Sequence, residues 1–199
     1  MQIEFVFDYR SPYAYLANTQ LLNLKHPIDY VPVDTLTVMK AVNNQPSTEC
    51  PAKAKYARID IARWGNLYNV PIVPNGQFFR ALSTGEVEGS LLSRAACAAQ
   101  QAGVFDQVHT AFFEALWTDG ENLSTADGRR DFLRKLELDI DLWHLADSRQ
   151  VRAQLIGNND DAASRGVFGV PSFFVDGELF FGNDRFEFVR AALNASGGV

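Results

Sequence analysis

Hydrophobic residues near the N-terminus alternate between strand-like and helix-like patterns. Residues 2–7 form a mostly apolar, β-rich run, and residues 28–33 form another. Between them, residues 11–24 carry apolar side chains at helical spacing, which predicts a helix. A strand, a helix and a second strand predict a βαβ unit, and such a unit favours parallel pairing of its strands.

The C-terminal end carries a different pattern. The runs SFFV (172–175) and LFF (179–181) are separated by turn-forming residues, which predicts a β-hairpin. Residues 184–193 then keep their apolar side chains on one helical face. This end of the chain therefore predicts two antiparallel strands followed by a helix.

The long middle of the chain has hardly any strand signal. Pro51 to Tyr68 and Val104 to Trp117 each keep apolar and aromatic residues on one helical face. Ser124 and Ser148 stand where N-caps of further helices belong. The middle is therefore predicted to be helical.

The order βαβ, helical block, ββα predicts an α/β protein with a thioredoxin-like fold that carries a large all-helical insertion. We place the thioredoxin-like domain at 1–40 and 165–199 and the inserted helical domain at 41–164. A chain of 199 residues is long enough for one domain with such an insertion.

Composition narrows the classes of function. Hydrophobic residues make up 47% and charged residues 21%, which is typical of a globular protein. The net charge of -6 argues against a nucleic-acid partner. No apolar run approaches the roughly 18 residues of a membrane span, and Met1 is followed by no signal-peptide pattern, so we expect a cytoplasmic protein. The histidines show no metal-ligand spacing, and we expect no metal.

Ser11 is the first candidate for chemistry. It precedes Pro12, and proline favours the first position of a helix, so Ser11 is predicted to cap the helix at 11–24. The simpler interpretation is a capping residue worth about 1 kcal/mol. However, a helix that starts at the end of the first strand directs a partial charge of roughly +0.5 at whatever binds there, which favours an anion.

A thiolate is one such anion. Thioredoxin folds usually carry a cysteine at this helix start, whereas here Ser11 and Ala14 stand where the cysteines of a CxxC motif would be. Cys50 and Cys97 are far apart, so we expect two reduced thiols and no dithiol exchange. A serine hydroxyl can donate a hydrogen bond to a thiolate from elsewhere, so the sequence suggests a thiol cofactor.

Two further motifs lie near the hairpin. In a thioredoxin-like chain the Val170-Pro171 bond, directly before the third strand, is expected to be cis and to face Ser11, which would leave the Val170 backbone free for an extended peptide. The alternative is a trans proline that only begins an edge strand. Asn183 and Asp184 offer acceptors to an ammonium group, although Asp184 also has capping-box spacing with Glu187.

Lys53 lies in the first turn after Pro51, where the helix dipole disfavours a cation. A bound carboxylate would offset that cost. The neighbouring Lys55 supports the alternative that both lysines are simply solvated.

These motifs together resemble one family along essentially the whole chain. The segments FDYRSPYAYL, Asn44 to Lys53 (N-x-P-x4-P-x-K) and GVFGVPSFFVDGELFFGNDR, with the helical middle, resemble the 2-hydroxychromene-2-carboxylate isomerases, relatives of the kappa-class glutathione transferases. The resemblance implies a dimer that binds glutathione as cofactor. It also implies a small aromatic carboxylate substrate, 2-hydroxychromene-2-carboxylate, which is isomerised to trans-o-hydroxybenzylidenepyruvate by reversible thiolate addition during the catabolism of aromatic compounds.

The resemblance also implies roles for single residues, with Ser11 stabilising the glutathione thiolate. The other implied glutathione-binding residues are Asn44 and Lys53 at the carboxylate end, Val170 and Pro171 at the cysteinyl unit, and Asn183 and Asp184 at the γ-glutamyl end. Phe181 departs from the tryptophan that many relatives have.

The residues around the substrate are less well defined by the sequence. The candidate pocket walls are Tyr9, Arg10, Tyr13, Trp64 and Phe181, with Arg10 and Arg185 as candidate cations for a carboxylate. A kappa-type transferase that consumes glutathione is the main alternative function, and a binding protein without turnover is a further one.

Overall fold

The structure is a computed structural model that describes residues 2–118 and 120–196, and the chain forms two compact units. One unit contains the residues up to Val70 and those from Asn158 onward, and the other is Pro71–Gly157. The sequence predicts boundaries at 40/41 and 164/165 instead. The compact unit that holds the sheet is larger for two reasons. Asp60, in the helix after Cys50, accepts a hydrogen bond from Tyr13 of the first helix. Asn158 donates to the Pro32 carbonyl at the end of the second strand, and Asn159 accepts from Asp34 N–H.

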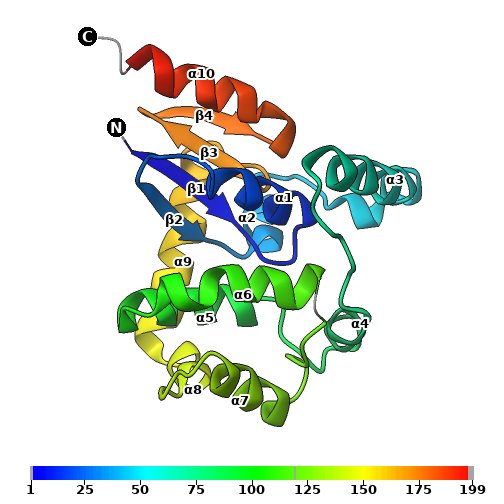
Figure 1. Cartoon of the computed structure of the whole chain (residues 1–199), viewed down its shortest axis with the longest axis vertical. Coiled ribbons are helices and arrows are strands. Elements are labelled where there is room, and N and C mark those ends of the chain that lie inside the picture. Colours follow the sequence, from blue (N-terminus) through cyan, green and yellow to red (C-terminus); the bar gives the residue numbers. More distant parts are fainter. Residues whose placement is uncertain (1, 119, 197–199) are drawn as a thin grey trace. The chain divides into compact units, whose positions relative to one another are not determined.

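The sheet-bearing unit contains four strands and the helices that cover them (Figure 1). Its elements are β1 (Ile3–Phe7), α1 (Pro12–Leu21), β2 (Ile28–Pro32), α2 (Thr35–Ala41), η1 (Ser47–Glu49), α3 (Pro51–Tyr68), β3 (Ser172–Val175), β4 (Glu178–Phe181), η2 (Asn183–Arg185) and α10 (Phe186–Ser196).

The second unit is built from helices in the part of the chain that the structure describes (Figure 1). Its elements are α4 (Gly76–Thr84), α5 (Leu91–Ala102), α6 (Phe105–Trp117), α7 (Ala126–Lys135) and α8 (Leu142–Ala146), and α9 (Arg149–Ser164) begins here and ends in the sheet-bearing unit. None of the described helices is long and apolar enough to cross a membrane.

The sheet has the strand order β2-β1-β3-β4. β1 pairs with β2 in parallel and with β3 in antiparallel orientation, and β3 forms a hairpin with β4. The predicted βαβ and ββα halves are therefore confirmed, and the described residues between β2 and β3 contain no strand. The fold is that of a thioredoxin-like protein with a helical insertion.

The two faces of the sheet bury different side chains, because successive residues of a strand point to opposite faces. On one face, Phe5 stacks on Phe173, whose ring in turn contacts Phe186 of α10. On the other face, Val6 and Phe174 join a buried cluster that includes residues of α2 and α9. β1 is thus buried on both sides and is the centre of the core.

Some helix ends differ from the prediction. Thr125, not Ser124, caps α7 by accepting a hydrogen bond from Gly128 N–H at 3.1 Å. Asn122 causes this shift, because its side chain bonds both Ser124 N–H and the Thr125 hydroxyl and so delays the helix by one residue. Ser148 is confirmed as the cap of α9, because its hydroxyl accepts from Val151 N–H at 3.3 Å.

The C-terminal helix also starts later than predicted. Asn183–Arg185 wind as a 3₁₀ turn, and α10 begins at Phe186. Asp184 therefore lies inside the turn and not at the N-cap position of α10. The suggested capping box between Asp184 and Glu187 does not form.

His109 of α6 is a buried histidine in an aromatic environment. Its ring stacks on Phe105 at 4.7 Å and meets Phe113 edge-on at 5.3 Å, and it is only 3% exposed. Burial lowers the pKa of His109 to about 3, because the charged form is costly away from water. His109 is therefore neutral in the folded protein at neutral pH.

We predict that His109 makes the protein less stable in mild acid. Its folded pKa lies below the unfolded value of about 6.5, so the stability is fully present above that value and is lost as the pH falls toward about 3. At about pH 5 the loss is on the order of 2 kcal/mol. In urea unfolding, the free energy of unfolding of His109→Gln is expected to depend less on pH than that of the wild type. His144→Gln changes an exposed histidine and is the control, which is expected to keep the wild-type slope. Equal slopes for all three proteins would contradict this assignment.

Thr35 gives a second prediction about stability. Its hydroxyl oxygen is buried and has no hydrogen-bond partner among the described residues. Thr37, two positions further along α2, donates its hydroxyl to Asp34 at 2.9 Å. We expect Thr35→Val to raise the free energy of unfolding by about 1 kcal/mol and Thr37→Val to lower it by a similar or smaller amount. The same urea measurement tests this pair, and an equal loss in both variants would argue against the buried orphan hydroxyl.

Candidate active site

Ser11 occupies the N-cap of α1, as predicted. Its backbone is extended (φ -89°, ψ 116°), and its hydroxyl oxygen accepts from Ala14 N–H at 3.2 Å. The same hydroxyl donates to the carbonyl of Val170 at 3.4 Å, which is long for a hydrogen bond to oxygen. The Ser11 proton is therefore weakly held and can be redirected to a better acceptor.

The first turn of α1 leaves one backbone donor unused in the described part of the chain. Pro12 has no N–H group, Ala14 N–H is taken by the Ser11 side chain, and Tyr15 N–H donates to the Ser11 carbonyl at 3.1 Å. Tyr13 N–H remains, next to the Ser11 hydroxyl. Sequence reasoning named the helix terminus as a donor site but missed that a single N–H supplies it.

The Val170-Pro171 peptide bond is cis, as expected. The pairing of Val6 with Ser172 sets this bond at the same edge of the sheet as Ser11, because both follow from the β1–β3 register. Val170 N–H makes no hydrogen bond to any residue that the structure describes, whereas the Pro171 carbonyl accepts from Gly182 N–H at 2.9 Å. The Val170 backbone is thus the part of this loop that is open to a ligand.

The loop before Pro171 is held by side chains from two sides. Asn44 donates its amide to the Phe168 carbonyl at 2.6 Å, and Ser172 donates its hydroxyl to the Gly169 carbonyl at 2.8 Å. Gly169 has no side chain, which lets the Phe181 ring lie against it; a Cβ there would be 3.0 Å from that ring. Asn44, a predicted ligand residue, therefore contacts the loop that carries Val170.

Lys53 lies beside α1, in a pocket of about 450 Å³. The pocket is lined by Tyr13, Ser47, Ala52, Lys53, Tyr56 and Ala57. Lys53 is exposed and forms no ion pair with the described residues. Its ammonium group is therefore available to a carboxylate.

Asp60 of α3 fixes the two tyrosines of this pocket. The Tyr13 hydroxyl donates to one carboxylate oxygen at 3.0 Å, and the Tyr56 hydroxyl donates to the other at 3.2 Å. Burial, helped by Asp60, raises the pKa of Tyr13 above its usual range, so the phenol stays protonated. These bonds attach α3 to α1, and Tyr13 of α1 lines the same pocket as Lys53.

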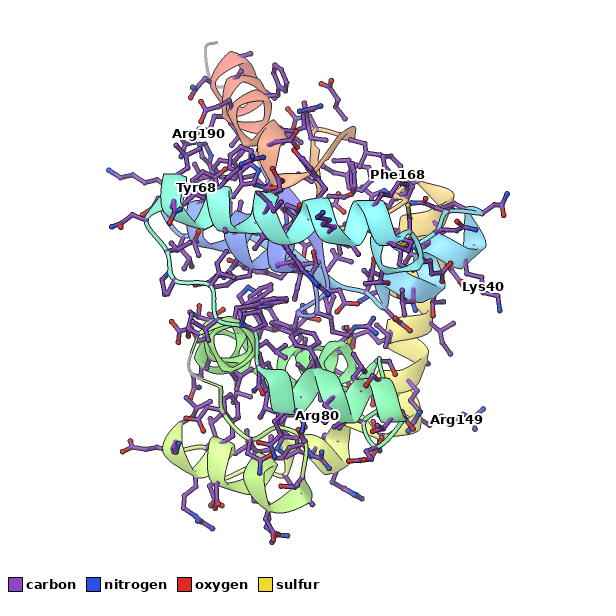
Figure 2. All side chains as sticks on the ribbon, turned by 90° about the vertical axis from the view of Figure 1, so that its right-hand side faces the viewer. Lys40, Tyr68, Arg80, Arg149, Phe168 and Arg190 are labelled. Atoms are coloured by element: carbon purple, nitrogen blue, oxygen red, sulfur yellow. The ribbon has the colours of Figure 1, made fainter. Side chains whose placement is uncertain are left out.

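Asn183 and Asp184 lie at the other end of α3. The Tyr68 hydroxyl donates to the Asn183 carbonyl at 3.4 Å, and Figure 2 shows Tyr68 and Phe168 toward opposite ends of α3. The Asn183 side chain is buried, and its amide nitrogen has no hydrogen-bond partner among the residues that the structure describes. Asp184 is exposed and pairs with Arg185 at 2.5 Å. Asp184 is also among the charges that raise the pKa of Tyr13, which brings it near α1.

Three residues that were expected around the substrate are buried or paired in the structure. Tyr9 is fully buried and lines no open surface. Arg10 is not free to bind a carboxylate, because its guanidinium already pairs with Asp8 and Asp34. Arg185 is likewise paired with Asp184. The sequence pattern does not reveal the tertiary contacts that bury Tyr9 and pair Arg10.

Both cysteines of the chain are free thiols. Cys50 and Cys97 form no disulfide, as expected. Cys97 is completely buried in α5, and burial raises its pKa to about 12. A nucleophilic thiolate at the Ser11 site is therefore not supplied by Cys97.

Comparison with known proteins agrees with the fold. A family model described as a DSBA-like thioredoxin domain matches residues 2–194. A 2-hydroxychromene-2-carboxylate isomerase from Sphingobium xenophagum is 32% identical over 96% of this chain and 97% of its own length. The chain belongs to the 2-hydroxychromene-2-carboxylate isomerase family.

Two more distant relatives of this family member are informative. A solved structure of a 2-hydroxychromene-2-carboxylate isomerase has a TM-score of 0.80 at 24% identity and covers 98% of this chain and 95% of its own, which supports the fold. The rat glutathione S-transferase kappa 1 is 24% identical over 96% of this chain and 90% of its own length. Similarity to the isomerases is therefore higher than similarity to this transferase.

Proposed function

We propose that the protein is a glutathione-dependent isomerase that interconverts 2-hydroxychromene-2-carboxylate and trans-o-hydroxybenzylidenepyruvate. Membership of the isomerase family supports the reaction. The observation that carries the site is the Ser11 hydroxyl, which caps α1 and lies 3.4 Å from the Val170 carbonyl beside a cis proline. Family resemblance also leads us to propose a homodimer.

The chemistry of the available groups suits glutathione, which carries a thiol between an ammonium-bearing end and a carboxylate end. Ser11 and Tyr13 N–H offer donors to an anion at the helix terminus. On one side Lys53 offers a cation that pairs with none of the described residues. On the other side Asp184 offers an exposed carboxylate that it would share with Arg185. Glutathione held in this way would supply a thiolate whose reversible addition turns a conjugated carbon-carbon double bond into a single bond that can rotate.

Each residue has a separate task in this proposal. Ser11 donates its proton to the thiolate sulfur and gives up the long bond to Val170, and a charge-assisted bond is worth about 1.5–3 kcal/mol. Val170 pairs with the cysteinyl backbone through its free N–H, in the manner of an added strand. Asn44 keeps that loop in place through Phe168, and Asn183 supports the turn that presents Asp184.

We predict that the purified protein interconverts the two isomers only when glutathione is present. The measurement is the ultraviolet absorbance of 2-hydroxychromene-2-carboxylate with no thiol, with glutathione and with S-methylglutathione. The methylated analogue fits the same contacts but has no ionisable thiol, so it is expected to support no turnover. Glutathione consumption during the reaction would instead favour a transferase, and interconversion without any thiol would contradict the proposed cofactor.

We further predict that Ser11→Ala binds glutathione but ionises it poorly. Loss of one bond to the thiolate is expected to raise the pKa of the bound thiol by about 1–2 units and to slow turnover about 10- to 100-fold at neutral pH. Thiolate absorbance titrated with pH measures the first effect, and the isomerase assay measures the second.

A matched variant separates the hydroxyl from the helix cap. Ser11→Asp keeps a strong N-cap but places a carboxylate beside the thiol. If Ser11 acts through the thiolate, this variant ionises glutathione less than Ser11→Ala does. Wild-type behaviour in Ser11→Asp would mean that only the cap matters and would exclude the proposed role.

A further inference from the structure

A buried ion cluster directly precedes Ser11 in the chain. Asp8 is 1% exposed, and the side chain of Arg10 is 9% exposed. Arg10 Nη2 lies 2.5 Å from a carboxylate oxygen of Asp8 and 2.5 Å from one of Asp34, so one guanidinium bridges two carboxylates. Buried charges are costly unless they are paired, and this pairing offsets that cost.

The cluster also fixes the turn that leads into α1. The Asp8 carbonyl accepts from Ser11 N–H at 3.0 Å, and a carboxylate oxygen of Asp8 accepts from Arg10 N–H at 2.9 Å. The other carboxylate oxygen accepts from Thr35 N–H at 3.0 Å, which ties the turn to the start of α2. Asp8 thus holds the backbone on which the Ser11 hydroxyl is mounted.

The charges of the cluster matter for an anion at Ser11. Asp8 and Asp34 carry two negative charges, and Arg10 carries the single positive charge that opposes them. Although burial alone would lower the pKa of Arg10, the two carboxylates more than offset it and raise that pKa, so the guanidinium stays charged. Without Arg10, uncompensated carboxylates behind Ser11 would disfavour a thiolate in front of it.

Arg10 is poorly placed to bind a substrate carboxylate, because its Nε and Nη2 atoms are engaged by Asp8 and Asp34 and its side chain is largely buried. Its bonding pattern indicates a role directed at the protein itself. A lysine would keep the charge but would lose the planar fork that reaches both carboxylates.

We propose that Arg10 is a positioning residue for the thiolate site: clamped between Asp8 and Asp34, it fixes the turn that presents Ser11 and cancels carboxylate charge that would oppose the thiolate. This inference rests on the proposed glutathione site, and it adds a residue that acts through Ser11 without touching the ligand.

The test measures the pKa of the bound glutathione thiol by its ultraviolet thiolate absorbance. In Arg10→Met we expect at least about a tenfold loss of thiolate at neutral pH, and in Arg10→Lys a smaller loss, because charge remains while geometry is lost. The affinity for S-methylglutathione, which has no ionisable thiol, is expected to stay within about threefold of wild type, because one to two kcal/mol of charge effect falls on the thiolate only. Arg130→Met, which removes an exposed arginine from α7, is the control and is expected to match wild type.

A second variant reports even where Arg10→Met does not fold. Asp34→Asn removes one negative charge from the cluster but keeps an oxygen that can accept from Arg10. This change is expected to increase the thiolate fraction, the opposite of the Arg10 variants. A merely structural cluster predicts no such increase.

The outcomes separate the two proposals. Suppose that the wild-type protein lowers the pKa of the bound thiol, and that folded Arg10→Met or Asp34→Asn leaves this pKa unchanged from wild type. That result overturns the role of Arg10 and leaves the glutathione site standing. A wild-type protein that binds no glutathione, or leaves its thiol pKa unchanged, overturns the proposed function and this inference with it.

Discussion

The antiparallel pairing of β1 with β3 is the interaction on which the site depends. It joins residues 3–6 to residues 172–175, so the chain must close across the whole helical segment before Ser11 and Val170 can meet. The bond between these two residues spans 159 positions in sequence. Because β1 is also paired with β2 and buried on both faces, the end of β1 is held firmly, and the helix that starts there inherits that position.

Position alone does not make the end of β1 a site for an anion. The turn between β1 and α1 brings a positive helix terminus and a hydroxyl donor to the edge of the sheet, but it also buries Asp8 behind them. The electrostatic environment of Ser11 is thus a balance, in which the terminus favours an anion and the carboxylate opposes it. Arg10 shifts that balance toward the anion, because its positive charge opposes the carboxylate of Asp8. This role accounts for a buried arginine that lies next to the site and pairs with the protein's own carboxylates.

Local pattern was sufficient for much of this arrangement. The strands, the cap at Ser11 and the hairpin follow from short stretches whose spacing or turn chemistry has a direct structural meaning. The cis bond before β3 was expected from the thioredoxin-like fold that these elements predict. The bonds that complete the site lack such a signature. Tyr13 meets Asp60 across 47 positions and Tyr68 meets Asn183 across 115, and no periodicity predicts which polar side chains pair across elements.

The same reason accounts for the errors. Arg10 was expected to be a free cation because the sequence gives no sign that Asp34, 24 positions away, would reach it. The compact unit that holds the sheet also contains α3, because the bond between Tyr13 and Asp60 attaches this helix to α1. Helical periodicity identifies the helix but not the surface that it covers.

Replacement of cysteine by serine at the start of α1 changes what the rest of the site has to do. A dithiol protein at this position would tune the reduction potential of its own sulfur atoms, whereas a serine can only stabilise a sulfur that arrives with a ligand. The site then needs groups that hold both ends of that ligand, and here Lys53 and Asp184 flank α1. α3 carries Lys53, and its Tyr68 contacts Asn183, the residue before Asp184. This helix, which the sequence assigns to the insertion, therefore connects the two ends of the proposed cofactor site.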